Sequence, residues 1–111
     1  MNEVFLTNWK SQVKKGTLTF IILNVLKDKK YYGYELIEQI RKFTEIEIAE
    51  GTLYPLLNRL KTENLVDSEW IEQETGIPRK YYRLTNTGIK TLLQMNSYWK
   101  NLETAIQKII Q

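Results

Sequence analysis

Apolar residues recur at helical spacing along most of the chain. Phe5, Trp9 and Val13 stand four residues apart, which predicts a short N-terminal helix over about residues 3–14 with one apolar stripe. Gly16 interrupts that pattern, and a first core helix is expected over residues 17–27. We expect this helix to be buried on most sides, because its apolar positions cover a wide face. They are Leu18, Ile21, Ile22, Val25 and Leu26, with Phe20 and Leu23 beside them.

Two more helices are expected at about residues 34–43 and 51–63, joined by a polar connector in which Ile46 and Ile48 are apolar anchors. The later helix has one apolar stripe at i, i+3, i+4 and i+7, formed by Leu53, Leu56, Leu57 and Leu60. Its opposite face carries Thr52, Tyr54, Pro55, Asn58, Arg59 and Lys61. Because a helix tolerates proline well only in its first turn, Pro55 places the start of this helix near Gly51.

The last third of the chain predicts a hairpin and a long helix. Residues 65–72 and 79–84 have the composition of strands, and the polar loop 73–78 between them contains glycine and proline. Thr85 is a suitable N-cap for a helix over residues 86–110. Its apolar residues form a heptad that suits a partner helix. Leu92, Trp99 and Ile106 occupy one core position, and Met95, Leu102 and Ile109 occupy the other.

The order of these elements predicts a mainly α protein with a small β-hairpin, a winged helix-turn-helix that binds DNA. Asn58 is suited to a bidentate contact with adenine, and Arg59 to guanine or phosphate. Arg79 and Lys80 lie where the hairpin would approach the DNA backbone. Taken singly, each of these residues is an ordinary exposed position. As an ordered set they favour DNA binding.

Composition narrows the function classes. A net charge of +3 and a pI near 9.1 permit nucleic-acid binding without requiring it. The chain has no cysteine or histidine, which excludes disulfides, thiolate or imidazole metal ligands and the common nucleophile pairs. Its carboxylates are scattered and it has no glycine-rich phosphate loop, so we expect no enzymatic activity, cofactor or metal. Without a signal peptide or a membrane-length apolar run, we expect a cytoplasmic protein.

Four segments match one known family in the same order. They are residues 15–18 (Lys-Gly-Thr-Leu), 32–36 (Tyr-Gly-Tyr-Glu-Leu), 50–57 (Glu-Gly-Thr-Leu-Tyr-Pro-Leu-Leu) followed by 59–60 (Arg-Leu), and 78–85 (Pro-Arg-Lys-Tyr-Tyr-Arg-Leu-Thr). The chain resembles the PadR family of bacterial transcriptional regulators from about residue 15 to its end. The resemblance implies a winged-helix repressor that binds palindromic operator DNA as a homodimer. Its short tail is similar to the compact subgroup that includes LmrR-type multidrug-sensing repressors.

These expectations assign residues 1–85 to a DNA-binding domain and residues 86–111 to a dimerisation helix. The expected DNA-contacting residues are Tyr34, Thr52, Tyr54, Pro55, Asn58, Arg59, Lys61, Arg79 and Lys80. The expected dimer interface is Phe5, Trp9, Leu92, Met95, Trp99, Leu102, Ile106 and Ile109, with the N-terminal stripe packed on the last helix.

Trp99 has two interpretations. An aromatic residue at a heptad core position suits dimer packing alone. The resemblance to LmrR-type repressors implies instead that two symmetry-related indoles hold a planar, cationic molecule, with Met95 and Glu103 beside them. The candidate ligand-contacting residues are Trp9, Val13, Met95, Trp99 and Glu103. We therefore expect a ligand-responsive repressor, and the alternative is a winged-helix adaptor that binds proteins without specific DNA binding.

Overall fold

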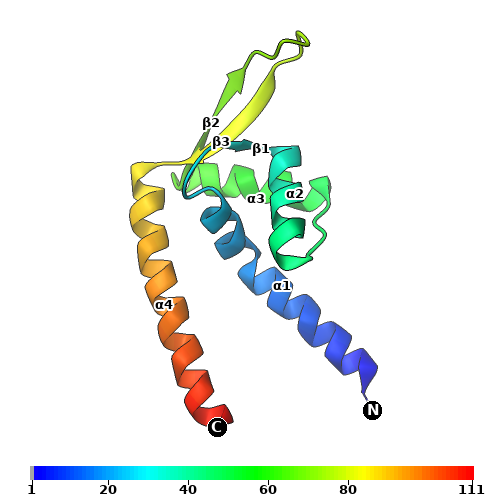
Figure 1. Ribbon diagram of the computed structural model, residues 1–111, viewed down its shortest axis with the longest axis vertical. Helices are drawn as coiled ribbons and strands as arrows, with labels where there is room; N and C mark the ends of the chain where they lie inside the picture. The colour runs from blue at the N-terminus through cyan, green and yellow to red at the C-terminus, as the bar shows by residue number, and fades with distance from the viewer. Residues whose placement is uncertain (1) are drawn as a thin grey trace.

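The computed structural model describes residues 2–111, which form four helices and one small antiparallel sheet of three strands (Figure 1). The elements in chain order are α1 (Glu3–Val25), β1 (Tyr31–Tyr32), α2 (Gly33–Thr44), α3 (Glu50–Thr62), β2 (Val66–Ile71), β3 (Arg79–Leu84) and α4 (Asn86–Ile110). The β2–β3 hairpin projects from one end of the molecule, while α4 and the N-terminal half of α1 extend from the other. This is the mainly helical fold with a small hairpin that the sequence predicts.

The first helix is continuous, so the predicted break at Gly16 is wrong. The helix α1 runs from Glu3 to Val25 and merges the expected helices at 3–14 and 17–27. A glycine inside a helix costs only about 1 kcal/mol relative to alanine, which is too little to end a helix that continues into the buried residues Leu18 and Ile22. The next residue, Thr17, satisfies its hydroxyl inside the helix by donating a hydrogen bond of 2.7 Å to the Val13 carbonyl.

The sheet contains one strand that the sequence did not predict. The two-residue strand β1 pairs with β3, so that the strand order is β1-β3-β2. Tyr31 lies opposite Tyr82, and Tyr32 lies opposite Tyr81. Two residues are too few to show a period in the sequence. The pairing fixes the start of α2 against the base of the hairpin, because Gly33 follows β1 directly.

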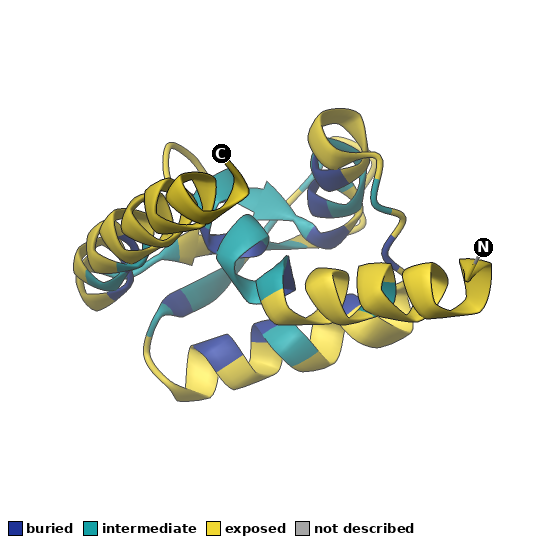
Figure 2. Ribbon diagram, turned by 90° about the horizontal axis from the view of Figure 1, so that it is seen from below, coloured by how far each residue is buried: buried dark blue, intermediate teal, exposed yellow. Residues whose placement is uncertain are grey.

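The core lies between the second half of α1, α2, α3 and the sheet (Figure 2). Its apolar residues are those of the predicted stripes, and Ile48 in the connector joins them as expected. The buried set is Leu18, Ile22, Leu23, Leu26, Leu36, Ile40, Ile48, Leu53, Leu57, Leu60, Val66, Tyr82 and Leu92. The residues of α3 opposite this core are exposed, as the pattern predicts.

The helix α3 begins at Glu50, within one residue of the predicted start, but the argument from proline is wrong. Pro55 is the sixth residue of the helix and lies beyond its first turn. A proline there cannot donate a hydrogen bond to the carbonyl four residues earlier, which belongs to Gly51. Gly51 is exposed, and water can therefore satisfy that carbonyl.

The helix α4 is mounted on the turn that ends α3. The Thr85 hydroxyl accepts a hydrogen bond from the Gly88 amide at 2.9 Å and donates one of 2.7 Å to the Asn64 carbonyl. The Thr85 amide donates to the Leu65 carbonyl at 3.1 Å. A Cβ added at Gly88 would collide with that same carbonyl oxygen. These bonds join the base of α4 to the turn that follows α3.

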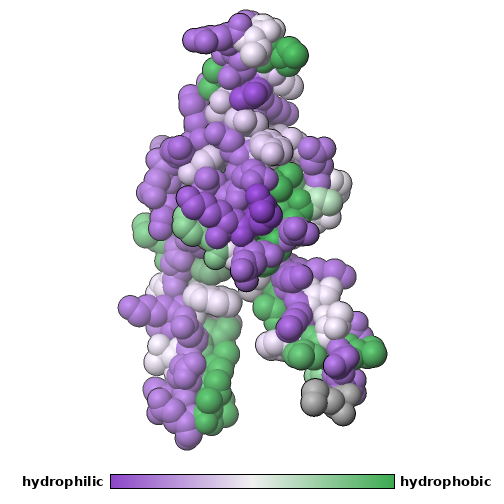
Figure 3. Space-filling view, turned by 45° about the vertical axis from the view of Figure 1, so that its right-hand side comes forward, coloured by the Kyte–Doolittle hydropathy of each residue, from purple (hydrophilic) through white to green (hydrophobic). Residues whose placement is uncertain are grey.

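Beyond this mount, α1 and α4 diverge, and their apolar stripes face solvent (Figure 1). A hydrophobic stripe runs along the side of α4 that faces α1 (Figure 3). Its residues Trp99, Leu102 and Ile106 are each 40–44% exposed. Phe5, Trp9 and Val13 on α1 are exposed too, so within one chain they do not pack on α4.

Leu92 is the exception in the predicted dimer interface. It is only 4% exposed and belongs to the core of its own chain, so its assignment to the interface is wrong. Met95 is partly buried against the same core. The heptad therefore has two roles. Leu92 and Met95 pack inside the domain, whereas its residues from Trp99 onward remain exposed for another partner.

Candidate nucleic-acid interface

A groove of about 480 Å³ lies between α3 and the β2–β3 hairpin. Four of the predicted DNA-contacting residues, Tyr54, Asn58, Arg79 and Lys80, line it. The other lining residues are Tyr32, Gly33, Trp70 and Tyr82. The structure thus brings together side chains from the third helix and the returning strand, which are far apart in the sequence.

Gly33 allows Tyr54 to lie in this groove. A Cβ at Gly33 would overlap the hydroxyl and ring of Tyr54, so only glycine lets the ring approach the first turn of α2. Gly33 is buried, whereas Tyr54 is 38% exposed at the wall of the groove. The contact holds α3 at a fixed distance from the start of α2, and it leaves the face of α3 that carries Asn58 open.

The outer face of the hairpin is neutralised by ion pairs. Arg83 contacts Asp67 at 3.0 Å and Glu69 at 3.4 Å, and Lys30 contacts Glu69 at 3.2 Å. These four side chains all lie more than one third exposed, so each pair contributes little to stability. The pairs matter for the electrostatic potential instead. Two cations and two carboxylates carry no net charge together, so this cluster does not attract a phosphate.

Arg79 and Lys80 differ from these cations. Within residues 2–111, neither forms an ion pair. Each lies instead near aromatic faces. The Arg79 guanidinium is 4.4 Å from the centre of the Tyr32 ring, and the Lys80 ammonium is 5.8 Å from the centres of both Trp70 and Tyr82. Such rings position a cation without cancelling its charge. Both residues line the groove, but alternation along β3 places Lys80 on the face of Trp70 and Arg79 on the face of Tyr81. Each face of the hairpin therefore presents one positive charge that is available to an anionic partner.

Tyr82 is the buried ring against which Lys80 lies. It is 2% exposed, and burial together with the nearby Tyr54 raises the pKa of its hydroxyl. Tyr82 therefore remains neutral at physiological pH and adds no negative charge beneath Lys80. Tyr81, on the other face of the sheet, packs edge-to-face on Tyr32 with ring centres 5.4 Å apart. Both tyrosines thus pack within the sheet.

The remaining predicted residues of α3 lie outside the groove. Residues separated by seven positions share a helix face, so Thr52 and Arg59 lie together on the edge of α3 away from the hairpin. The Arg59 guanidinium is 3.9 Å from Glu63. Pro55 is exposed between the two edges, and Lys61 donates a hydrogen bond of 2.9 Å to the Ser68 hydroxyl on β2. Lys61 thus links the helix to the hairpin.

Tyr34 is also outside the groove. It is 59% exposed on α2, four residues before Glu38 and seven before Arg41. Those two residues form an ion pair of 2.5 Å, and the bond to Glu38 raises the pKa of Arg41. Tyr34 therefore belongs to the outward face of α2, and nothing in the described chain places it with the groove residues.

The sequence profile of the PadR-like transcriptional regulator family matches residues 22–94, which include the groove, the hairpin and most of the core. The chain belongs to the PadR-like family. The family consists of transcriptional regulators, so membership implies that the molecule binds DNA. The matched span contains all eight residues of the groove.

Solved structures of PadR-like regulators have the same winged-helix fold. A PadR family transcriptional regulator from Eggerthella lenta is 31% identical, with a TM-score of 0.85 over 98% of this chain and 95% of that one. A PadR-like transcriptional regulator from Bacillus cereus is 32% identical, with a TM-score of 0.82 over 90% and 97%. An uncharacterized Lysinibacillus sphaericus protein is 30% identical over 104 residues, which cover 92% of this chain and 95% of the relative.

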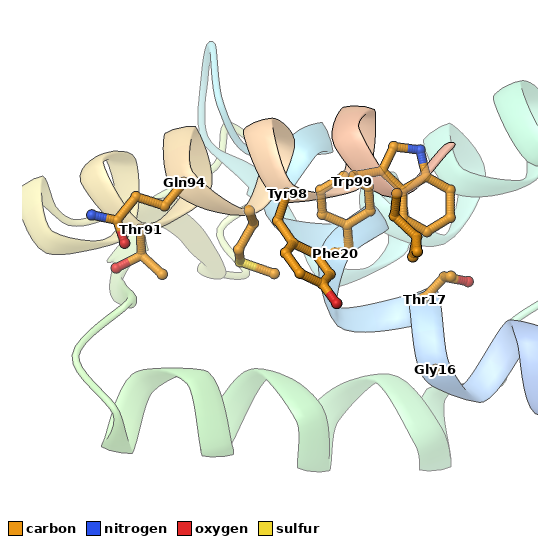
Figure 4. A pocket seen from close by; sticks show the side chains of 9 residues that line it. Gly16, Thr17, Phe20, Thr91, Gln94, Tyr98 and Trp99 are labelled. Carbon is orange, nitrogen blue, oxygen red and sulfur yellow. The ribbon is translucent and has the colours of Figure 1, made fainter. Parts of the chain in front are cut away.

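This PadR-like chain has a second concave site, a cavity of about 460 Å³ between α1 and α4 (Figure 4). It is lined by Gly16, Thr17 and Phe20 from α1 and by Thr91, Gln94, Met95, Tyr98, Trp99 and Leu102 from α4. Thr91 and Gln94 lie at one end, and the rings of Phe20, Tyr98 and Trp99 gather toward the other. Phe20 and Trp99 are in contact, with ring centres 5.2 Å apart and planes inclined by 34°.

The cavity includes only part of the predicted ligand-contacting set. Met95 and Trp99 line it, whereas Glu103 lies with Trp99 in a smaller adjoining hollow of about 110 Å³. Trp9 and Val13 line neither space. They lie on the N-terminal half of α1, which diverges from α4. Across residues 2–111, no helix combines the length and apolar character that crossing a bilayer demands.

Proposed function

We propose that this PadR-like regulator is a repressor that binds palindromic operator DNA as a homodimer. The α3 helix lies in the major groove, and the hairpin lies along the adjacent backbone. The observation that carries this proposal is the groove that Asn58 lines together with Arg79 and Lys80. Asparagine is the side chain best matched to an adenine edge, and unpaired cations suit the phosphates next to it.

A second copy of the chain is the partner that the exposed stripes favour. Trp99, Leu102 and Ile106 on α4 and the stripe of α1 form exposed apolar faces, and a partner that covered them would remove this surface from water. These faces lie at the end of the molecule opposite the hairpin. A dimer joined there can place two copies of α3 toward the same side of a DNA duplex, and twofold symmetry in the protein calls for a palindrome in the operator.

The substitution Asn58→Ala tests the role of α3. We expect it to cost about 1–3 kcal/mol of operator affinity because one bidentate base contact is lost. Binding to unrelated DNA should change little, since Asn58 carries no charge. Fluorescence anisotropy with the operator and with a shuffled duplex measures both quantities. Asn101→Ala, an exposed asparagine on α4, is the matched control. Equal operator affinity for wild type and Asn58→Ala would show that α3 does not read the DNA through this residue.

The α1–α4 cavity supports a ligand-responsive form of this function. Its apolar, aromatic lining suits a planar molecule, and it lies on the same side of α4 as the stripe assigned to the dimer. A ligand between Phe20 and Trp99 would alter the angle between α1 and α4. Because α4 is bonded to the end of α3 through Thr85, that change would alter the spacing of the two DNA-reading helices. Such coupling is reciprocal, so DNA must change ligand affinity by the same factor.

Tryptophan fluorescence tests this ligand site. We expect a planar cationic dye such as ethidium, in the absence of DNA, to quench the wild-type protein. Trp99→Ala should weaken dye binding about tenfold or more, because stacking and desolvation at Trp99 are lost. Trp9 and Trp70 remain as internal reporters, and Trp70→Ala is the control outside the cavity. Unchanged dye affinity in Trp99→Ala would assign Trp99 to packing alone.

A further inference from the structure

Trp70 is the largest exposed apolar side chain on the hairpin. It is 68% exposed and lies in β2 directly opposite Lys80 of β3. Alternation along the strand places it on the same face as Ser68, which accepts the hydrogen bond from Lys61 of α3. Trp70 therefore belongs to the inner face of the hairpin, toward α3. Covering this exposed indole with a partner is favourable, because apolar surface is then removed from water.

The surroundings of Trp70 define the chemistry of that partner. The Lys80 ammonium lies 5.8 Å from the indole centre, and Asn58 faces the same groove from α3. The site thus combines the flat apolar indole of Trp70, the adjacent unpaired ammonium of Lys80 and the amide of Asn58. A deoxyribose with its phosphate has the matching pattern, because the sugar offers carbon–hydrogen surface and is joined through an ester oxygen to a negatively charged phosphate. The acidic residues Asp67 and Glu69 point to the opposite face, where they are paired with Arg83 and Lys30.

We infer that Trp70 packs on a deoxyribose of the DNA strand that passes along the hairpin, while Lys80 binds the phosphate next to that sugar. The contact rests on the proposed DNA binding and adds a residue to it. It contributes affinity without sequence preference, because every nucleotide has the same sugar. It is also apolar, so it releases no counterion, whereas the contact of Lys80 does.

Salt dependence separates the two contacts. We expect Trp70→Ala to weaken binding about tenfold on the operator and on shuffled DNA alike, which corresponds to about 1.4 kcal/mol. The slope of log affinity against log salt should remain that of the wild type. Lys80→Ala should lower the magnitude of that slope by about 1. Trp70→Phe should keep most of the affinity. Thermal unfolding of Trp70→Ala should match the wild type, since the side chain is exposed and fills no core space.

Fluorine NMR of the full-length protein labelled with 5-fluorotryptophan provides the second measurement. The three resonances are assigned by Trp9→Phe, Trp70→Phe and Trp99→Phe. We expect the Trp70 resonance to shift on adding duplex DNA and to lose its solvent isotope effect. A loss of affinity confined to the operator would instead indicate base contact and overturn the sugar assignment. A wild type that binds DNA while Trp70→Ala binds it equally overturns this inference alone. A wild type that binds no DNA overturns the proposed function as well.

Discussion

We expect the double variant Leu102→Asp, Ile106→Asp to be a folded monomer at concentrations where the wild type is a dimer. Both residues lie on the exposed stripe of α4, at 40% and 44% exposure, and neither belongs to the core. The domain should therefore fold without them. At a dimer interface the new carboxylates would lose water without gaining a partner, at a cost of several kcal/mol for each subunit. Loss of the dimer should also lower operator affinity, because a monomer contacts only one half-site.

Sedimentation velocity, with circular dichroism to confirm helix content, measures this outcome. The matched control is Leu93→Asp, Gln107→Asp, which adds the same two carboxylates to exposed positions on the other side of α4. This control should remain dimeric. If Leu102→Asp, Ile106→Asp sediments as a stable dimer, the subunits associate through a different surface, and the proposed relation between α4 and the operator is wrong.

The second large effect is expected from the free cations of the groove. Arg79→Ala with Lys80→Ala should weaken binding to every DNA sequence, by about tenfold or more at moderate salt, and should lower the magnitude of the salt slope by about 2 for each subunit. Both side chains lack an ion pair within residues 2–111 and lie over rings that leave their charge intact.

The chain offers a matched control for this experiment. Lys30→Ala with Arg83→Ala removes the same number of positive charges from the same sheet, but these cations are already paired with Asp67 and Glu69. Anisotropy titrations over a range of salt concentrations should show a much smaller change in slope for this control. Equal slopes for the two double variants would mean that only net charge matters, and that the groove has no special role.

The fold was predictable where side chains follow a long period. The apolar stripes of α2 and α3 determine which faces are buried, and both helices lie within a few residues of their predicted ends. Gly16 misled the prediction because glycine weakens a helix without ending it. β1 was missed because it is two residues long and exists only through its pairing with β3. Leu92 continues the heptad, but its burial depends on how α4 is mounted on the domain.

The site was predictable only in part. Asn58, Arg79 and Lys80 could be chosen because a polar helix face and a basic strand have recognisable compositions. Tyr32 and Gly33 could not be placed there, because the short strand β1 brings them to the groove. Trp70 and Lys80 are neighbours through the hairpin register, and a one-residue slip would have moved the indole to the other face. Likewise, the ion pairs that neutralise Arg83 but not Arg79 depend on cross-strand partners.

The most direct test of the central proposal is the affinity of the wild-type protein for the DNA upstream of its own gene. The same duplex with a shuffled sequence is the control, and both are measured by anisotropy at physiological salt. The structure predicts binding to the native duplex about a thousandfold tighter than to the shuffled one, as sequence-specific regulators show. A footprint should contain two half-sites about 34–36 Å apart. Equal, weak affinity for both duplexes would contradict specific repression at that site and favour a winged-helix protein that binds other proteins.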